Sequence, residues 1–401
     1  MRNPTTDRSP DAAQGAGRFR SVNDARNTYL DHASGQPLHP AAREVLERAL
    51  DRGYADPRRL HQPAREARLM LDNARAVVAE CLEVSPDQVT FTPSGTHAVH
   101  LGVLGLLAGR TRQGDLLLAS SVEHSAVLHA GSWHAARGGR FETVEVDARG
   151  RVSPGSVADA AAAHGVPAVV AIQSANSEVG VMQPVSEVAE AVDAPVFMDA
   201  CASTGRLPLP RGWAAAAASA HKWGGPAGVG VLLVDRAARW RNPFPGDERV
   251  DDRAAGFENV PAALAAAAAL RASLEEQAQL SAEHASLTTM LAEAVRSIPD
   301  TDVFLAPGDR LPHLLAFSCL YVDGEALVTE LDRLGFAVAS GSACTASSLE
   351  PSHVLAAMGA LTHGNVRVSL GRDTDAAEVH RLANVLPALV ERLRTRAGVA
   401  R

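Results

Sequence analysis

Short apolar runs alternate with helical stretches from residue 89 to residue 234, and this alternation constrains the fold more than any other feature of the chain. It predicts an α/β protein in which helices cover both faces of a largely parallel sheet. The strand-like runs are Val89–Thr92, Leu116–Ala119, Ala168–Ile172, Val196–Asp199 and Gly230–Val234, and the helical stretches include Ala98–Leu107, Ala126–Ala136 and Val185–Val192. In such sheets, ligand-binding side chains gather at the carboxyl ends of the strands.

A second cluster of elements follows a strongly helical stretch at Val260–Leu280. We expect a strand at Leu314–Val322, a helix at Gly324–Leu334, a strand at Val366–Leu370 and a last helix that starts near Asp375. The spacing of Asp and Glu at the start of that helix resembles a capping box. These elements predict a second, smaller α+β unit.

The chain has 401 residues, which allows two domains. We expect a large domain over residues 39–265. A smaller domain is expected from residues 28–38 together with residues 266–401. Residues 1–27 mix Arg, Asp, Pro, Gly and Ser without periodicity, which is typical of a disordered tail.

The composition, with 46% hydrophobic and 21% charged residues, is that of an ordinary soluble enzyme. A net charge of −8 provides no basic stripe, so we expect neither nucleic acid nor a membrane as a partner. No apolar stretch reads as a signal peptide or a membrane span. The four cysteines lack the paired spacing of a disulfide framework or a zinc site, which predicts a cytoplasmic protein without a bound metal.

Lys222 is the only lysine of the chain, although Lys and Arg together number 38. Arginine cannot replace lysine where a primary amine must form an imine, because a guanidinium stays protonated and delocalised. A single amine retained in a glycine-rich turn therefore suggests a Schiff-base lysine. The alternative is an accident of an arginine-rich composition.

The residues around this lysine and at other strand ends match what an aldehyde cofactor such as pyridoxal phosphate needs. Gly95 and Thr96 stand where a strand gives way to a helix, so backbone N–H groups and a hydroxyl can meet a phosphate. Ser219 and His221 can add donors to the same phosphate. Helix capping is the other reading of such a turn.

Asp199 and His124 are candidates for contact with the cofactor's ring. Asp199 ends an apolar run, where a carboxylate is costly unless it is paired, and a protonated pyridine nitrogen would pair with it. A helix N-cap is the alternative reading of Asp199. His124 could stack on a ring and shuttle protons, although a lone histidine is more often structural.

Cys344 lies in Ala339–Ser352, a segment of small and hydroxylated residues that predicts a mobile exposed loop. An exposed thiol suits a nucleophile or a sulfur carrier. Arg367 lies inside an apolar strand, where its guanidinium needs a carboxylate. That carboxylate could belong to a substrate or to a structural salt bridge.

With these residues in place, the chain resembles a pyridoxal-phosphate-dependent cysteine desulfurase of the class V aminotransferase superfamily, over roughly residues 28–394. The segments that carry the resemblance, in matching order, are Tyr29–Ala33, Thr92–Thr96, Glu123-His124, Asn176–Gly180, Asp199-Ala200, Ser219–Lys222, Val322–Leu327, Ser340–Pro351 and Arg367–Gly371. The cysteine-containing segment is the most specific of them. The resemblance implies the fold type I of pyridoxal-phosphate-dependent transferases and a homodimer.

The resemblance also implies a role for each candidate residue. Lys222 would form the Schiff base and move protons, Asp199 would hold the pyridine nitrogen, and His124 would stack on the ring. The phosphate would be held by Gly95, Thr96, Ser219 and His221.

The implied reaction converts L-cysteine to L-alanine. Arg367 would bind the substrate carboxylate, and Asn176 would lie beside cofactor and substrate. Cys344 would attack the substrate sulfur and carry it as a persulfide to an acceptor protein or a thiol.

Six positions depart from the family pattern, and His97, Ala254 and Ala255 are among them. Ala202 stands where a Gln is usual, Ser177 stands where an Asn is usual, and Phe257 replaces a Thr expected to reach the phosphate in the other subunit. These departures leave two further functions open. One is a C–S lyase or a sulfur donor of specialised metabolism, and the other is a non-catalytic scaffold of a sulfur-transfer complex.

Overall fold

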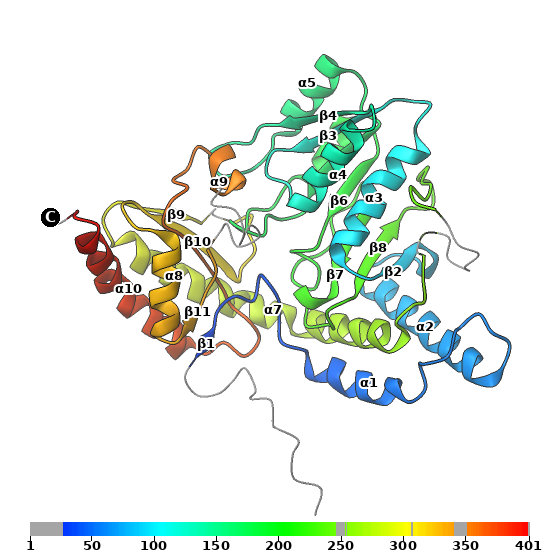
Figure 1. The fold of residues 1–401 in the computed structure, drawn as a ribbon, viewed down its shortest axis with the longest axis horizontal. Coiled ribbons are helices and arrows are strands. Elements are labelled where there is room, and N and C mark those ends of the chain that lie inside the picture. The colour runs from blue at the N-terminus through cyan, green and yellow to red at the C-terminus, as the bar shows by residue number, and fades with distance from the viewer. Residues whose placement is uncertain (1–26, 246–252, 254, 306–307, 341–350, 400–401) are drawn as a thin grey trace, which may run out of the picture.

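A computed structural model of the protein describes residues 27–245, 253, 255–305, 308–340 and 351–399. Figure 1 shows a large lobe around a central sheet and a smaller lobe beside it, with helix α7 (Val260–Arg296) running beneath both. The tail expected at residues 1–27 falls outside the described residues except for Asn27.

The large sheet confirms the prediction of a largely parallel arrangement. Within the described residues its seven strands follow the order β2-β8-β7-β6-β5-β3-β4. Strands β7, β6, β5, β3 and β4 are parallel, whereas β8 runs antiparallel to both of its neighbours. The strands are β2 (Val89–Thr92), β3 (Leu116–Ser120), β4 (Arg140–Val144), β5 (Val169–Gln173), β6 (Val196–Asp199), β7 (Trp213–Ser219) and β8 (Gly230–Val234).

Each central strand buries both of its faces, because successive side chains point to opposite sides of a sheet. In β6, Phe197 packs into the apolar cluster under α3 and α4, whereas Met198 packs into the cluster on the other face. The helices of the first face are α3 (Gly95–Gly109) and α4 (Ser125–Ala135). Those packed against the second include α2 (Gln62–Cys81), α5 (Pro154–His164), α6 (Val185–Ala191) and the first half of α7.

Strand β7 was not expected from the sequence. Its run of alanines has high helix propensity, yet it forms the strand between β6 and β8. Ala216 and Ala217 are almost fully buried on opposite faces. Tertiary pairing therefore overrides local propensity at the centre of the sheet.

The smaller lobe contains an antiparallel sheet in the order β12-β10-β9. Its elements are β9 (Thr301–Phe304), β10 (Leu314–Cys319), α8 (Gly324–Arg333), β11 (Phe336–Ala337), α9 (His353–Ala357), β12 (Asn365–Ser369) and α10 (Ala376–Arg396). The capping box of α10 is present, with Asp375 and Glu378 exchanging hydrogen bonds. The N-terminal strand β1 (Thr28–Tyr29) pairs with β11, so the start of the described chain belongs to this lobe.

Helix α7 links the two lobes. It was predicted to end near Leu280 but continues to Arg296. Val260–Leu270 contributes to the core of the large lobe, whereas Leu287–Val295 contributes to that of the smaller lobe. The one helix therefore supplies apolar surface to two cores. Among the described helices, none combines the length and apolarity needed to cross a membrane.

Candidate active site

The carboxyl ends of the parallel strands meet at one edge of the large sheet, as the sequence predicted. Gln173 ends β5 and is paired with Asp199 at the end of β6, and Ser219 ends the adjacent β7. A cavity of about 170 Å³ opens at this edge. The predicted residues that line it are Gly95, Thr96, His124, Asp199, Ser219, His221, Lys222 and Arg367.

One end of the cavity is a cradle for an anion. Gly95 is the first residue of α3, and the Ser94 side chain caps this helix by accepting a hydrogen bond from the N–H of His97. A Cβ atom at Gly95 would lie 2.6 Å from Cβ of Ser219, so only glycine lets α3 approach β7 this closely. Ser219 Oγ in turn lies 3.1 Å from Nδ1 of His221. The first N–H groups of a helix lack partners within it, so this corner suits a phosphate.

Asp199 supplies a nearly buried carboxylate to the cavity, with 5% of its surface exposed. Its Oδ1 accepts a hydrogen bond from the N–H of Cys201 at 2.9 Å. Cys201 also lines the cavity, and burial together with the Asp199 charge raises the pKa of its thiol well above the usual value. The Cys201 thiol therefore stays protonated, and the Asp199 carboxylate is the group at this end that can pair with a cation.

His124 has the structural role that was its alternative reading, and it also lines the cavity. It is the N-cap of α4, where its Nδ1 accepts a hydrogen bond from the N–H of Ala126 at 3.1 Å. Since Nδ1 accepts, the proton of the neutral ring is on Nε2. Burial lowers the pKa of His124, the charge of Asp199 opposes this shift and that of Lys222 adds to it. A neutral imidazole, oriented by its cap, therefore lines the cavity.

The preceding residue, Glu123, is fully buried beside the site. Its Oε1 accepts hydrogen bonds from Ser120 Oγ at 2.6 Å and from the N–H of Gln173 at 2.8 Å, whereas Oε2 has no partner. Burial raises the pKa of this carboxyl to about 8. Glu123 therefore joins the ends of β3 and β5 as a neutral acid at pH 7.

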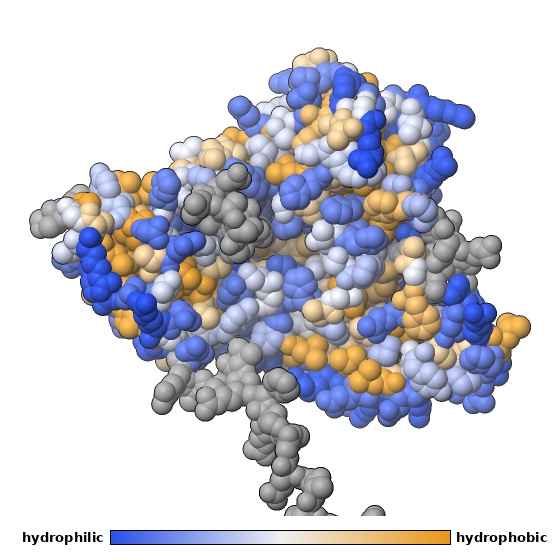
Figure 2. Space-filling model, in the orientation of Figure 1, coloured by the Kyte–Doolittle hydropathy of each residue, from blue (hydrophilic) through white to orange (hydrophobic). Residues whose placement is uncertain are grey.

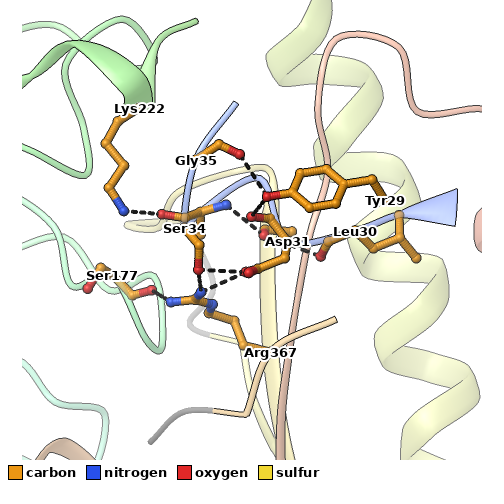
Figure 3. Close-up of polar contacts among 10 residues, drawn as sticks. Tyr29, Leu30, Asp31, Ser34, Gly35, Ser177, Lys222 and Arg367 are labelled. Atoms are coloured by element: carbon orange, nitrogen blue, oxygen red, sulfur yellow. Dashed lines mark hydrogen bonds and ion pairs between the residues drawn. The ribbon is translucent and has the colours of Figure 1, made fainter. Parts of the chain in front are cut away.

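Lys222 lies in the short turn Ala220–Lys222 that follows β7, and its Nζ donates to the carbonyl oxygen of Ala33 (Figure 3). Gln36 Nε2 donates to the backbone oxygen of Lys222 at 2.9 Å. The lysine of the large lobe is therefore held against the N-terminal segment, which also runs along the smaller lobe.

Arg367 reaches the cavity from β12 of the smaller lobe and makes the salt bridge that was its alternative reading. Its Nη2 donates to Asp31 Oδ1 at 2.8 Å and to Ser34 Oγ at 2.6 Å, and its Nη1 donates to the Ser177 carbonyl at 2.9 Å (Figure 3). Nε is buried and has no hydrogen-bond partner. Asp31 and Ser34 were not predicted as its partners; the only signal was the match of Tyr29–Ala33 to the family pattern.

Asn176 does not line the cavity. Its Oδ1 accepts hydrogen bonds from the N–H groups of Glu178 and Val179, and its Nδ2 donates to the Val122 carbonyl at 3.1 Å. The amide of Asn176 therefore makes hydrogen bonds that stabilise its own turn. The neighbouring Ser177 lines the cavity instead. These bonds give Asn176 a structural role in its turn, and its contact with a cofactor stays a prediction. Other lining residues that sequence reasoning did not place there are Gln173, Cys201 and Ala202.

Cys344 lies outside the described residues, but the chain on both sides of its segment is held beside the cavity. Ala339 exchanges two backbone hydrogen bonds with Arg367, at 2.7 and 3.2 Å. On the far side, Ser352 Oγ donates to Glu178 Oε2 at 2.6 Å, and His353 Nε2 lies 2.9 Å from the carbonyl oxygen of Glu123. Within the part of the chain that the structure covers, no cluster of His, Cys, Asp and Glu could hold a metal ion.

Comparison with known proteins agrees with this geometry. Residues 28–382 match the family model described as Aminotransferase class-V. The IscS-like cysteine desulfurase of Mycobacterium tuberculosis is 35% identical, over 93% of this chain and 98% of that protein. Cysteine desulfurase IscS of Dictyoglomus turgidum is 30% identical, over 92% and 96% of the two chains. A solved structure of a NifS-like protein superposes with a TM-score of 0.84 at 25% identity, covering 92% of this chain and all of that one.

Proposed function

The chain belongs to the class-V aminotransferase family, and we propose that it is a cysteine desulfurase, which takes the sulfur of L-cysteine and releases L-alanine. The observation that carries this proposal is the meeting of Lys222, Asp199 and Arg367 in one cavity. An amine, a carboxylate and a guanidinium there match the three charged groups needed to hold a cofactor and an amino acid. The relatives named as cysteine desulfurases, at 30% and 35% identity, support the same activity.

The cofactor that these residues fit is pyridoxal 5'-phosphate. The Gly95 corner, which a Cβ atom would fill, offers room and donors for the phosphate, together with Thr96, Ser219 and His221. When bound, the cofactor supplies an aldehyde for an amine to condense with and a ring that withdraws electrons from the substrate. Lys222 is the chain's only side-chain amine for that aldehyde.

The protein's own residues then bind, orient and move protons. Asp199 would keep the pyridine nitrogen protonated, because a buried carboxylate favours a cation beside it. Lys222 would take a proton from the substrate α-carbon, since its amine lines the same cavity. His124 would lie against the ring, with an N–H on Nε2 for a further proton step.

Arg367 holds the substrate carboxylate. Three of its N–H groups already bind Asp31, Ser34 and the Ser177 carbonyl, which fixes the plane of the guanidinium. Two of its five N–H groups, on Nε and on Nη1, make none of these bonds and remain for a ligand. A guanidinium held rigidly in this way loses little entropy when it binds a carboxylate.

Cys344 is proposed as the acceptor of sulfur. Its thiolate attacks the substrate sulfur, an S–S bond forms, and the C–S bond breaks with its electron pair left on the substrate carbon, which takes up one proton to become the methyl group of alanine. The hydrogen bonds of Ala339, Ser352 and His353 support this role, because they hold the chain on both sides of the Cys344 segment beside the cavity. The persulfide then passes to an acceptor protein or a thiol.

We also propose a cytoplasmic homodimer. Leu50, Tyr54 and Leu60 are large apolar residues exposed on the connection between α1 (Pro40–Leu50) and α2. Figure 2 shows apolar residues reaching the surface in this region. Exposed apolar side chains gathered in one place are typical of a surface that another chain covers.

The proposal is tested with a Cys344→Ser variant that is assayed for alanine and sulfide from L-cysteine. We expect both products to fall to background while cysteine still changes the cofactor's absorption spectrum. Cys81→Ser is the matched control, because Cys81 lies at the end of α2 and does not line the cavity. Sulfide release at the wild-type rate would reject the persulfide step and favour a C–S lyase. A protein that stays colourless with added pyridoxal phosphate would favour the scaffold.

Borohydride trapping tests the Schiff base separately. Reduction of the holoenzyme followed by peptide mapping should place the cofactor on the peptide that contains Lys222. A label on any other peptide would reject the assignment of Lys222.

A further inference from the structure

A second cavity lies between the two lobes and shares no lining residue with the first. Its walls come from the N-terminal segment, from Gly205-Arg206 of the large lobe, from the middle of α7, and from Arg372-Asp373 of the smaller lobe. A much smaller cavity, lined by both Arg206 and Lys222, lies between the two. Nothing in the proposed reaction uses this second site.

Four buried polar atoms without a hydrogen-bond partner belong to residues that line this cavity. They are Nη2 of Arg206, Oε2 of Glu276, Nε2 of His39 and Nδ1 of His32. Buried polar groups in native proteins are nearly always paired, and each exception calls for an explanation. Four of them around one cavity indicate a missing polar occupant.

Arg206 is the positive pole of the cavity. It makes no side-chain hydrogen bond or ion pair among the described residues. Burial lowers the pKa of its guanidinium to about 9. The charge of Arg206 also helps to lower the pKa values of the nearby His32, His284 and His313, so these rings are neutral and do not compensate it. A cation in this setting favours a carboxylate.

The acids that line the cavity do not supply that carboxylate. Asp373 Oδ1 lies 3.1 Å from Nη2 of Arg372. Glu276 Oε1 lies 3.5 Å from Nε2 of His39, without a hydrogen bond between them, and its Oε2 is unpartnered. Glu276 is therefore the negative pole of the same cavity: His39 lies within ion-pair distance of its Oε1, and its Oε2 has no hydrogen-bond partner.

His39 adds a donor at the negative pole. Its Nδ1 accepts the N–H of Ala41 at the start of α1, so Nε2 is the ring nitrogen that can donate. The cavity thus offers N–H donors at Arg206 and His39 and an acceptor at Glu276. A simple anion would accept hydrogen bonds from Arg206 but would give Glu276 no donor. A ligand that carries both a negative and a positive charge can pair with both residues.

We propose that this cavity binds a small amino acid as its zwitterion, with the carboxylate on Arg206 and the ammonium group on Glu276. Such a ligand would join Arg206 of the large lobe to Glu276 in the middle of α7. The proposal does not depend on the function proposed above, because the two cavities share no lining residue and the test needs no turnover.

The test is calorimetric titration of the holoenzyme with sarcosine. This probe keeps a carboxylate and two N–H donors, but as a secondary amine it cannot form the neutral imine that would place it at Lys222. Acetate carries only the carboxylate of such a ligand, and methylammonium carries only its ammonium group. We expect saturable sarcosine binding, at least about tenfold weaker binding of acetate, and no binding of methylammonium.

Three variants locate the site. Arg206→Gln should weaken sarcosine binding at least about tenfold, and Glu276→Gln should reduce it to the level of acetate. Arg372→Gln is the matched control, since this arginine lines the same cavity but is paired with Asp373, and it should bind sarcosine as the wild type does. If Arg206→Gln fails to fold, Glu276→Gln and the comparison of sarcosine with acetate decide the question.

Several results would overturn the proposal. The wild type could fail to bind sarcosine saturably, which would leave ordered water as the occupant. Arg206→Gln could bind sarcosine as tightly as the wild type. Equal binding of acetate and sarcosine by the wild type would reject the zwitterion. Cysteine turnover by the same preparations reports separately on the proposed desulfurase.

Discussion

Asp31 Oδ1 lies 2.8 Å from Nη2 of Arg367, so the arginine proposed to bind the substrate carboxylate is already paired with a carboxylate of its own chain. Asp31 belongs to the N-terminal segment and Arg367 to β12, which are 336 residues apart in the sequence. Their contact holds the guanidinium at the mouth of the proposed active site (Figure 3).

This contact predicts the effect of Arg367→Lys. A lysine keeps the charge but cannot reach Asp31, Ser34 and the substrate at once, because it lacks the planar fork of arginine. The loss of a charged hydrogen bond costs about 1.5–3 kcal/mol, so the KM for L-cysteine should rise roughly 10- to 100-fold, with a smaller fall in kcat. Alanine formation at varied cysteine concentration measures both. Arg392→Lys, at an exposed pair with Glu330, is the control, and an unchanged KM in Arg367→Lys would reject the role.

Lys222→Arg should abolish turnover while the fold is retained. The side chain points from the turn after β7 toward the N-terminal segment, where a guanidinium can still donate to the Ala33 carbonyl. It cannot form an imine or act as a base at neutral pH, so cysteine turnover should fall at least about 1,000-fold. Circular dichroism checks the fold and sulfide release checks activity. Turnover within tenfold of the wild type would contradict the proposal.

Glu123→Gln should change how stability depends on pH. Burial raises the pKa of Glu123 to about 8 in the folded protein, above the ordinary value of 4.5. The folded state therefore binds this proton more tightly than the unfolded state, and the group makes stability fall as the pH rises from about 4.5 to about 8. Glutamine does not titrate, and its oxygen can still accept from Ser120 and Gln173.

Thermal unfolding of wild type and Glu123→Gln should therefore be compared from pH 5 to pH 8.5. The Tm of the variant minus that of the wild type should increase as the pH rises, and this increase should be complete above pH 8. Titrating groups shared by both proteins cancel in the difference. Parallel curves over the whole range would show that Glu123 is ionised in both states.

Cys201→Ser should leave sulfide release close to that of the wild type. Cys201 lines the cavity, but burial and the charge of Asp199 hold the pKa of its thiol far above its usual value, so it does not supply the thiolate nucleophile. Serine fits the same space and keeps the backbone hydrogen bond to Asp199. A loss of sulfide release with normal cofactor binding would make Cys201, and not Cys344, the acceptor of sulfur.

Much of the large lobe could be predicted because its information is local. Runs such as Val196–Asp199 are apolar enough to be buried on both faces, and helices between them require parallel strands. Parallel strands bring their carboxyl ends to one edge, which is why Asp199, Ser219 and the residues after β3 could be expected together. The uniqueness of Lys222 singled out its amine, although an accident of composition remained the alternative reading.

The partners of these groups depend on contacts between distant segments. No local pattern pairs Asp31 with Arg367, commits the amide of Asn176 to its own turn, or turns an alanine run into the strand β7. The cavity around Arg206 and Glu276 likewise exists only because α7, the N-terminal segment and the smaller lobe meet there. Amino-acid order determined which chemical groups the protein has and which strand ends carry them. Tertiary packing decided which of those groups are paired and which are left for a ligand, because pairing in a buried site is set by distance in space and not by separation along the chain.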